Sequence, residues 1–295
     1  MTALLTAVKS RLFIQTRLAS SHPLDGAYAS LQRGRSLDFE DLREYEHGDD
    51  VRDVDWRATA RAGELLIKRS RATRMHTVVF AVDTGHGMAA LSPDERPKSE
   101  LAVLAVGSLG LLATRHGDDV SVIHGDASGV TRTPPRRSEA GLEHALRAIS
   151  AATSLDSPAS SRDTLLGSVA RTVQKRTILV VVTDEQPISP AHESLLRRLQ
   201  VQHDVLWVTV RDADPVLDHR VEIARRDVDS GWLVPEFLHG DAQVVADLAA
   251  ERAEAGRRRA ATLDRLEVSH AELSHAETAV PRILAMLARR SHVRS

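Results

Sequence analysis

The sequence predicts an α/β protein built on one doubly wound, mostly parallel sheet. Two continuous apolar runs, at residues 76–83 and 177–184, each end on an aspartate, a pattern typical of strands buried on both faces. Segments with helical apolar spacing follow both runs and alternate with further short apolar runs. Because strands that alternate with helices favour a parallel sheet covered on both faces, this is the fold class that we expect.

The chain is predicted to begin with a helix. Apolar residues recur at helical spacing near its start, at Leu4, Leu5, Val8 and Leu12. Lys9 and nearby arginines interrupt the apolar core that a signal peptide requires. We therefore expect an amphipathic helix here.

An extended arm is expected after this helix. Residues 20–46 have little periodicity and are interrupted by proline and glycine. Residues 65–68 are predicted to form a short edge strand. We assign residues 1–33 to a helix and arm, and residues 34–295 to one domain, because no later composition shift indicates a second boundary.

The core elements are expected in alternation after residue 76. Thr164 is interpreted as the cap of one helix, and Pro281 falls in the first turns of the last one. Helices are predicted at residues 98–115, 138–152, 164–175, 190–201, 241–266 and 276–290. Besides the two apolar runs, strands are predicted at residues 120–123, 130–132, 203–210, 221–223, 231–237 and 267–273. The strand at 130–132 is expected at an edge, antiparallel to its neighbour.

Composition excludes several classes of function. The 295 residues contain no cysteine, which excludes disulfides and thiolate chemistry and fits a cytoplasmic protein. The net charge of −2 and the aromatic content of 3% argue against a nucleic-acid partner. The longest uncharged run, at residues 101–114, is too short to cross a bilayer, so we expect a buried helix and no membrane insertion.

Residues 48–61, GDDVRDVDWRATAR, combine both signs of charge around Trp56. The charged residues are Asp49, Asp50, Arg52, Asp53, Asp55, Arg57 and Arg61. Asp53, Arg57 and Arg61 are four residues apart, so a helix would present them on one face. The large indole of Trp56 is expected to be buried. We interpret the segment either as a salt-bridged clamp that locks the arm onto the core or as a docking surface for another protein.

Asp83 and Asp184 end the two long apolar runs. In a doubly wound sheet, ligands bind beyond the carboxyl ends of the strands, and the helix that Thr164 begins is expected between them. Two carboxylates and a hydroxyl can hold a hard divalent ion. The alternative, left open here, is that each aspartate caps the helix that follows it.

Other chemical motifs are absent from the sequence. There is no phosphate-binding glycine loop, no G-x-S-x-G elbow and no H-E-x-x-H pair. His270 and His275 are five apart, and we expect them at a strand end facing solvent or the edge of the core.

The run GRSLDFEDLREYEHGDDVRDVDWRATARAGELLIKR, followed by VVFAVDTGHGM, resembles the domain of unknown function 58 family, most specifically at REYEHGDDVRDVDW. The resemblance extends from about residue 34 through the final helix. It implies a von Willebrand factor A-like, Rossmann-like sheet. It also implies a non-enzymatic adaptor role beside a MoxR-type AAA+ ATPase and its client protein. Longer relatives carry membrane helices, and we expect none in these residues.

The resemblance also implies a degenerate metal-ion-dependent adhesion site. Von Willebrand factor A-like proteins hold magnesium with a D-x-S-x-S motif, a threonine and a second aspartate. Here Asp83 and Asp184 match the aspartates and Thr164 the threonine, whereas glycine stands at both serine positions, Gly85 and Gly87. Since magnesium requires an octahedral oxygen shell, we expect weak binding or none. His86 is interpreted as a loop residue rather than a ligand.

These observations favour an interaction module. The sheet edge at Asp83, Thr164 and Asp184 would face a partner, and the segment 48–61 would brace the domain. One rival is a metal-dependent hydrolase that uses Asp83 and Asp184, with Asp49 or Asp50 brought near by the fold. A second is a structural protein that only oligomerises. No general base or nucleophile is evident for the hydrolase.

Overall fold

The computed structural model describes residues 3–18, 42–46, 54, 56–68, 76–219 and 225–293. Five charged residues of the segment 48–61 lie outside the described residues, and so does the strand predicted at residues 221–223. These five are Asp49, Asp50, Arg52, Asp53 and Asp55.

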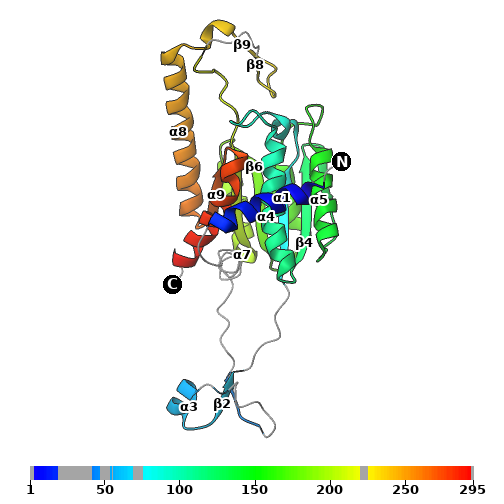
Figure 1. Ribbon diagram of the computed structural model, residues 1–295, viewed down its shortest axis with the longest axis vertical. Helices are drawn as coiled ribbons and strands as arrows, with labels where there is room; N and C mark the ends of the chain where they lie inside the picture. Colours follow the sequence, from blue (N-terminus) through cyan, green and yellow to red (C-terminus); the bar gives the residue numbers. More distant parts are fainter. Residues whose placement is uncertain are drawn as a thin grey trace.

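One mixed sheet of six strands forms the centre of the fold (Figure 1). Its strands in sequence are β3 (Thr77–Asp83), β4 (Asp119–Asp126), β5 (Gly129–Arg132), β6 (Ile178–Asp184), β7 (Asp204–Val210) and β10 (Ser269–Leu273). Their spatial order is β10-β7-β6-β3-β4-β5, and only β5 is antiparallel to its neighbour. Counted from β3, this is the doubly wound order 3-2-1-4-5-6, which reverses between β3 and β6.

Helices cover both faces of this sheet. On one face lie α1 (Leu4–Leu18), α4 (Lys98–Arg115), α5 (Glu139–Ala152) and α9 (Ala276–Val293). On the other lie α6 (Arg162–Thr172), α7 (Pro190–Gln202) and α8 (Ala242–Arg265). The central strand β3 serves both layers, because Phe80 and Val82 point to the first core and Val79 and Ala81 to the second. The fold class predicted from the sequence is confirmed.

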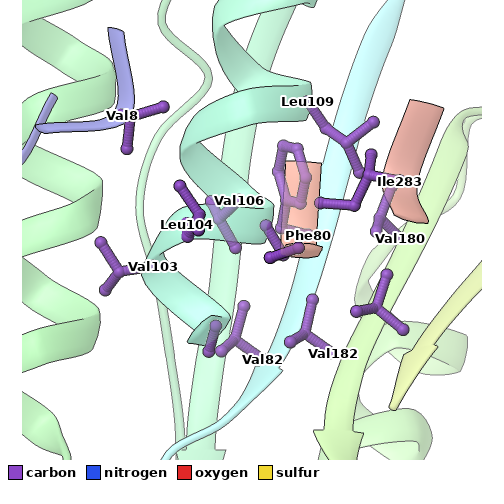
Figure 2. Packing of buried hydrophobic residues seen from close by; sticks show 14 of the residues in the cluster. Val8, Phe80, Val82, Val103, Leu104, Val106, Leu109, Val180, Val182 and Ile283 are labelled. Carbon is purple, nitrogen blue, oxygen red and sulfur yellow. The ribbon is translucent and has the colours of Figure 1, made fainter. Parts of the chain in front are cut away.

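The N-terminal helix α1 packs onto the domain. Its buried residues are Leu5, Val8 and Leu12, three of the four predicted apolar positions. Figure 2 shows Val8 beside α4. A Cβ added at Gly107 of α4 would come within 2.7 Å of this valine. Glu143 of α5 accepts the backbone N–H groups of Leu4 and Leu5 at 3.2 and 2.8 Å. A carboxylate from α5 therefore caps the start of α1, where unpaired N–H groups favour negative charge.

Two predicted details are wrong. The cap of α6 is Ser161, whose hydroxyl accepts the N–H of Thr164, so Thr164 lies in the first turn and is not the cap. The strand predicted at residues 231–237 is a two-residue strand, β9 (Leu233–Val234), followed by the 3-10 helix η3 (Glu236–Leu238). Pro235 separates them, and β9 pairs only with the equally short β8 (Arg225–Arg226). Proline has no N–H group to donate to a longer ladder.

A small peripheral unit contains the described part of the segment 48–61. Strand β1 (Leu42–Glu44) pairs with β2 (Leu66–Lys68), and α3 (Trp56–Ala62) lies between them in sequence. Figure 1 shows β2 and α3 apart from the main sheet. Trp56 is 64% exposed, so the expectation that it is buried is wrong. Helix α3 has no buried residue, and two three-residue strands are too small to cover an indole.

Across the described ranges, no helix combines the length and the apolar character needed to cross a membrane. The most apolar of these helices, α4, buries Leu101 to Ala113 against the sheet and its neighbouring helices instead.

Candidate functional site

Asp83 and Asp184 lie next to each other at the carboxyl edge of the sheet. Strands β3 and β6 pair in parallel, with Val82 opposite Val182, so their last residues end at the same place. This is the point at which the strand order reverses, where ligands bind in doubly wound folds. Both residues are buried: Asp83 is 2% exposed and Asp184 is 3% exposed. The fold therefore places side by side the two aspartates that the sequence analysis assigned to one edge of the sheet.

The two oxygens of Asp83 have different environments. Oδ1 accepts the backbone N–H of Gly85 at 2.9 Å, whereas Oδ2 is buried and has no hydrogen-bond partner within the described residues. Burial raises the pKa of Asp83 to about 6, and the nearby charge of Asp184 adds to the rise. The Gly85 N–H, the Ser160 hydroxyl and Arg162 act in the opposite direction. The Ser160 hydroxyl is near, yet its geometry falls outside that of a hydrogen bond.

Asp184 is held by a residue that the sequence analysis did not single out, Arg162. The guanidinium is 4% exposed and donates to Oδ1 of Asp184 at 2.8 Å and to its backbone carbonyl at 2.9 Å. It also donates to Thr183 Oγ1 at 3.0 Å and to the carbonyls of Gln186 and Pro187 at 2.8 and 3.0 Å. A guanidinium has five N–H donors, and all five are used here.

Two features hold Arg162 in this position. It is the first residue of α6, placed by the Ser161 cap, and its guanidinium lies 5.7 Å from the ring centre of the buried Trp207. A positive charge is normally unfavourable at a helix N-terminus, and burial of that charge is unfavourable as well. The carbonyl groups and the carboxylate of Asp184 that accept from Arg162 must offset both costs. The signal available in the sequence was an arginine two residues before the helix predicted to begin at Thr164, directly after the serine-rich residues 154–161.

The third predicted site residue, Thr164, contacts the helix cap. Its hydroxyl accepts the hydroxyl proton of Ser161 at 2.9 Å, and its N–H donates to the same oxygen. Neither aspartate caps the long helix after it. Ser189 caps α7, and α4 begins after Pro97. The simple capping alternative is therefore wrong for both carboxylates.

Gly85 and Gly87 lie against Ser160. A Cβ at Gly85 would come within 2.5 Å of the Ser160 backbone nitrogen, so the chain itself fills that space. A Cβ at Gly87 would meet only the Ser160 hydroxyl at 3.2 Å and Oδ2 of Asp184 at 3.5 Å. The two glycines thus allow the serine-rich loop to approach the end of β3.

The three histidines considered in the sequence analysis make local polar contacts. His86 contacts the Ser157 carbonyl through Nδ1 at 3.1 Å and Asp229 through Nε2 at 2.6 Å. His270 contacts Asp264, and His275 contacts the hydroxyl of its neighbour, Ser274. The interpretation of His86 as a loop residue agrees with these contacts.

Ion pairs surround the central carboxylates. Lys98, 1% exposed, pairs with Asp212 after β7, and burial raises the pKa of that carboxyl. Arg252 of α8 donates to Glu185 at 2.8 Å. Arg259 of α8 donates to the Glu185 carbonyl at 2.6 Å and to Glu272 at 2.7 Å. The edge of the sheet is thus fastened to α4 and α8 by charge pairing rather than left open.

Comparison with known proteins identifies the family. The family model "Protein of unknown function DUF58" matches residues 41–255. This chain belongs to that family. An uncharacterized protein of Mycobacterium tuberculosis H37Rv is 29% identical to it over 223 residues, which cover 72% of this chain and 67% of the relative. A counterpart in Mycobacterium bovis matches to the same extent.

Solved structures show a distant likeness. An aerotolerance-related membrane protein from Bacteroides fragilis, with multiple mutations to serines, has a TM-score of 0.43 and 16% identity, covering 72% of this chain and 99% of its own. A von Willebrand factor type A protein from Catenulispora acidiphila has a TM-score of 0.40 and 11% identity, covering 73% and 42%. The DUF58 chain has the doubly wound, mostly parallel sheet that the sequence predicts.

The magnesium site of von Willebrand factor A-like proteins does not fit the residues present. Oδ1 of Asp184 accepts from Arg162, and the backbone of Ser160 occupies the space of the first missing serine. Within the described ranges, no three histidine, aspartate or glutamate side chains form a group suited to a metal ion. Oδ2 of Asp83 has no hydrogen-bond partner among the described residues and could accept a metal ion. The nearby guanidinium of Arg162, however, repels a divalent cation from it.

Proposed function

We propose that this DUF58 protein is a non-enzymatic protein-interaction module that works with a MoxR-type AAA+ ATPase in the assembly or maturation of a client protein, in the cytoplasm. Family membership and the von Willebrand factor A-like fold that the resemblance implies support an interaction role. The choice of partner rests on what the resemblance of REYEHGDDVRDVDW to the family implies.

The observation that carries the proposal is a group of exposed apolar side chains on the segment 225–238. Trp232, Leu233 and Phe237 are 56%, 48% and 80% exposed. Isolated exposed apolar residues are common, but three within six positions, two of them aromatic, are typical of a recognition surface. We name these three residues the aromatic tip.

The aromatic tip is anchored to the carboxyl edge of the sheet. Asp229, in the turn between β8 and β9, contacts His86 after β3. Arg225 donates to Glu95 in the loop before α4 at 2.6 Å and to the Asp214 carbonyl after β7 at 2.9 Å. The segment is therefore held by loops that follow two core strands, and a partner on the tip would lie close to the candidate site.

The test uses the purified chain and a purified MoxR-type AAA+ ATPase from the same organism. Binding is measured by biolayer interferometry, with ATP and with ADP. The double variant Trp232→Ser/Phe237→Ser is expected to weaken binding about tenfold or more, as removal of interface hot spots does.

The matched control is Val201→Ser. Val201 is 87% exposed, but it lies on α7 near the start of β7, at the opposite edge of the sheet. The control should bind as the unmodified chain does. Equal binding by the double variant, absence of binding by the unmodified chain, or substrate turnover by the purified chain alone would each contradict the proposal.

A further inference from the structure

The carboxyl edge presents an electrostatic problem that the fold has to solve. Asp83 and Asp184 end adjacent strands and are almost completely buried, and burial of ionised carboxylates is unfavourable without a compensating positive charge. In proteins with this sheet order, a ligand or ion bound at the switch point can supply that charge. Here a side chain of the same chain reaches the position.

We infer that the guanidinium of Arg162 is a built-in cation that replaces a bound divalent ion at the switch point of this sheet. The inference goes beyond the proposed function and holds whether or not an ATPase binds. It concerns how the edge is neutralised, and it predicts which single substitution turns the edge into a metal site.

The contacts of Arg162 are those of a cation in a closed site. Five oxygen acceptors surround it: one carboxylate oxygen, one hydroxyl and three carbonyls. No donor remains for an incoming ligand. The positive charge of Arg162 acts on both aspartates. It pairs directly with Asp184, and it opposes part of the rise that burial causes in the pKa of Asp83.

The same contacts order the loop after β6. The carbonyls of Asp184, Gln186 and Pro187 all accept from Arg162, which is the first residue of α6. A metal ion that exchanges with solvent would order such a loop only while it is bound. The guanidinium belongs to the chain itself, so it orders the loop at all times. The edge is therefore expected to keep one conformation in the presence or absence of divalent ions.

Removal of the guanidinium leaves oxygen ligands behind. Oδ2 of Asp83 and the hydroxyl of Ser160 are buried without hydrogen-bond partners in the described part of the chain, and Oδ1 of Asp184 would lose its arginine. With a serine at position 162, the shorter side chain leaves the space of the guanidinium open to an ion and its water. Carboxylate and hydroxyl oxygens are the donors that Mg²⁺ and Mn²⁺ prefer.

The experiment compares the unmodified chain with Arg162→Ser, using MnCl2 and MgCl2 as probes in thermal-shift and calorimetric titrations. The melting temperature of the unmodified chain is expected to be independent of both ions. That of Arg162→Ser is expected to fall without metal and to rise by several degrees with millimolar Mn²⁺, because a ligand that binds only the folded state stabilises it. Adding Asp83→Asn to Arg162→Ser should abolish the response.

The matched control is Arg259→Ala, which also removes a buried, paired arginine at the same edge of the sheet, but one whose contacts are with Glu272 and the Glu185 carbonyl and not with either aspartate. It should lose stability and gain no response to Mn²⁺. If Arg162→Ser does not fold alone, it is refolded with and without MnCl2, and the soluble yield should rise with the ion. Arg162→Lys keeps the charge and should stay insensitive to metal.

Two results would overturn the inference. One is binding of Mn²⁺ by the unmodified chain that Asp83→Asn abolishes, since the site would then be open despite Arg162. The other is failure of Mn²⁺ to stabilise or rescue Arg162→Ser. Neither result bears on whether the aromatic tip binds an ATPase, so the two proposals can fail separately.

Discussion

The switch point of the sheet buries charged side chains, whereas the aromatic tip exposes large apolar ones. At the switch point, the charged residues Asp83, Asp184 and Arg162 are buried. On the tip, the large apolar residues Trp232 and Phe237 are exposed. Ordinary folding energetics would favour the reverse in both places.

This difference indicates that the two regions have different roles, one in stability and one in recognition. The buried charges are closely paired, so their effect is to fix the loops at the edge of the sheet. The exposed rings are little stabilised by the fold, which is why we propose that they are recognised by another molecule. Substitutions should therefore affect stability at the switch point and recognition at the tip, and the predictions below test this division.

The largest expected effect is that of Arg162→Met. A side chain of similar length fills the space but leaves the buried carboxylate of Asp184 without its partner, so the free energy of unfolding should fall by about 3–5 kcal/mol. Urea denaturation followed by circular dichroism measures it. The control Arg258→Met removes an exposed pair with Glu254 and should change stability by no more than about 1 kcal/mol. Similar values for both would refute a special role for the buried pair.

Asp83→Asn should stabilise the protein above pH 6. The pKa of Asp83 rises from its ordinary 3.8 to about 6 on folding, so the folded state binds the proton more tightly. Its contribution to stability therefore falls as pH rises from 3.8 to about 6 and stays low above that.

Asparagine abolishes this dependence. The variant should gain up to about 3 kcal/mol over the unmodified chain near pH 8, and the gain should vanish below about pH 4. Urea denaturation of both proteins across this pH range measures the difference. A gain that is constant with pH would show that Asp83 does not carry the titration.

The two glycines after β3 should differ in their tolerance of serine. Gly85→Ser places a Cβ against the backbone of Ser160 and should cost about 1–3 kcal/mol, as overpacking does. Gly87→Ser meets a hydroxyl that can rotate, so its cost should be smaller. Thermal denaturation of both variants compares them directly, and equal melting temperatures would contradict the close approach of the loop to Gly85.

The sequence predicted most of the fold because the fold depends on strong local signals. The apolar runs that end on Asp83 and Asp184 are long and continuous, and the helix predicted at residues 98–115 has the observed bounds of α4. Trp56 was misjudged because burial depends on what surrounds a residue. No sequence pattern shows that α3 has no core to pack against.

The site was predicted in part for the same reason. The parallel pairing of β3 and β6 places Asp83 beside Asp184, and this follows from topology. The position of Arg162 does not, because its five acceptors come from the end of β6 and the loop that follows, more than twenty residues further along the chain. Thr164 matched the family motif in sequence, but its contacts are with the helix cap.

The smallest effect on stability is expected for the exposed tryptophans. Trp56→Ala and Trp232→Ala should each change the free energy of unfolding by no more than about 0.5 kcal/mol, as substitutions of exposed residues usually do. Trp207→Ala, at the fully buried third tryptophan, is the matched control and should cost about 3–5 kcal/mol. Guanidinium denaturation followed by circular dichroism measures all three. A loss at Trp56 or Trp232 as large as that at Trp207 would mean that the ring packs within its own chain, and the case for recognition through it would fail.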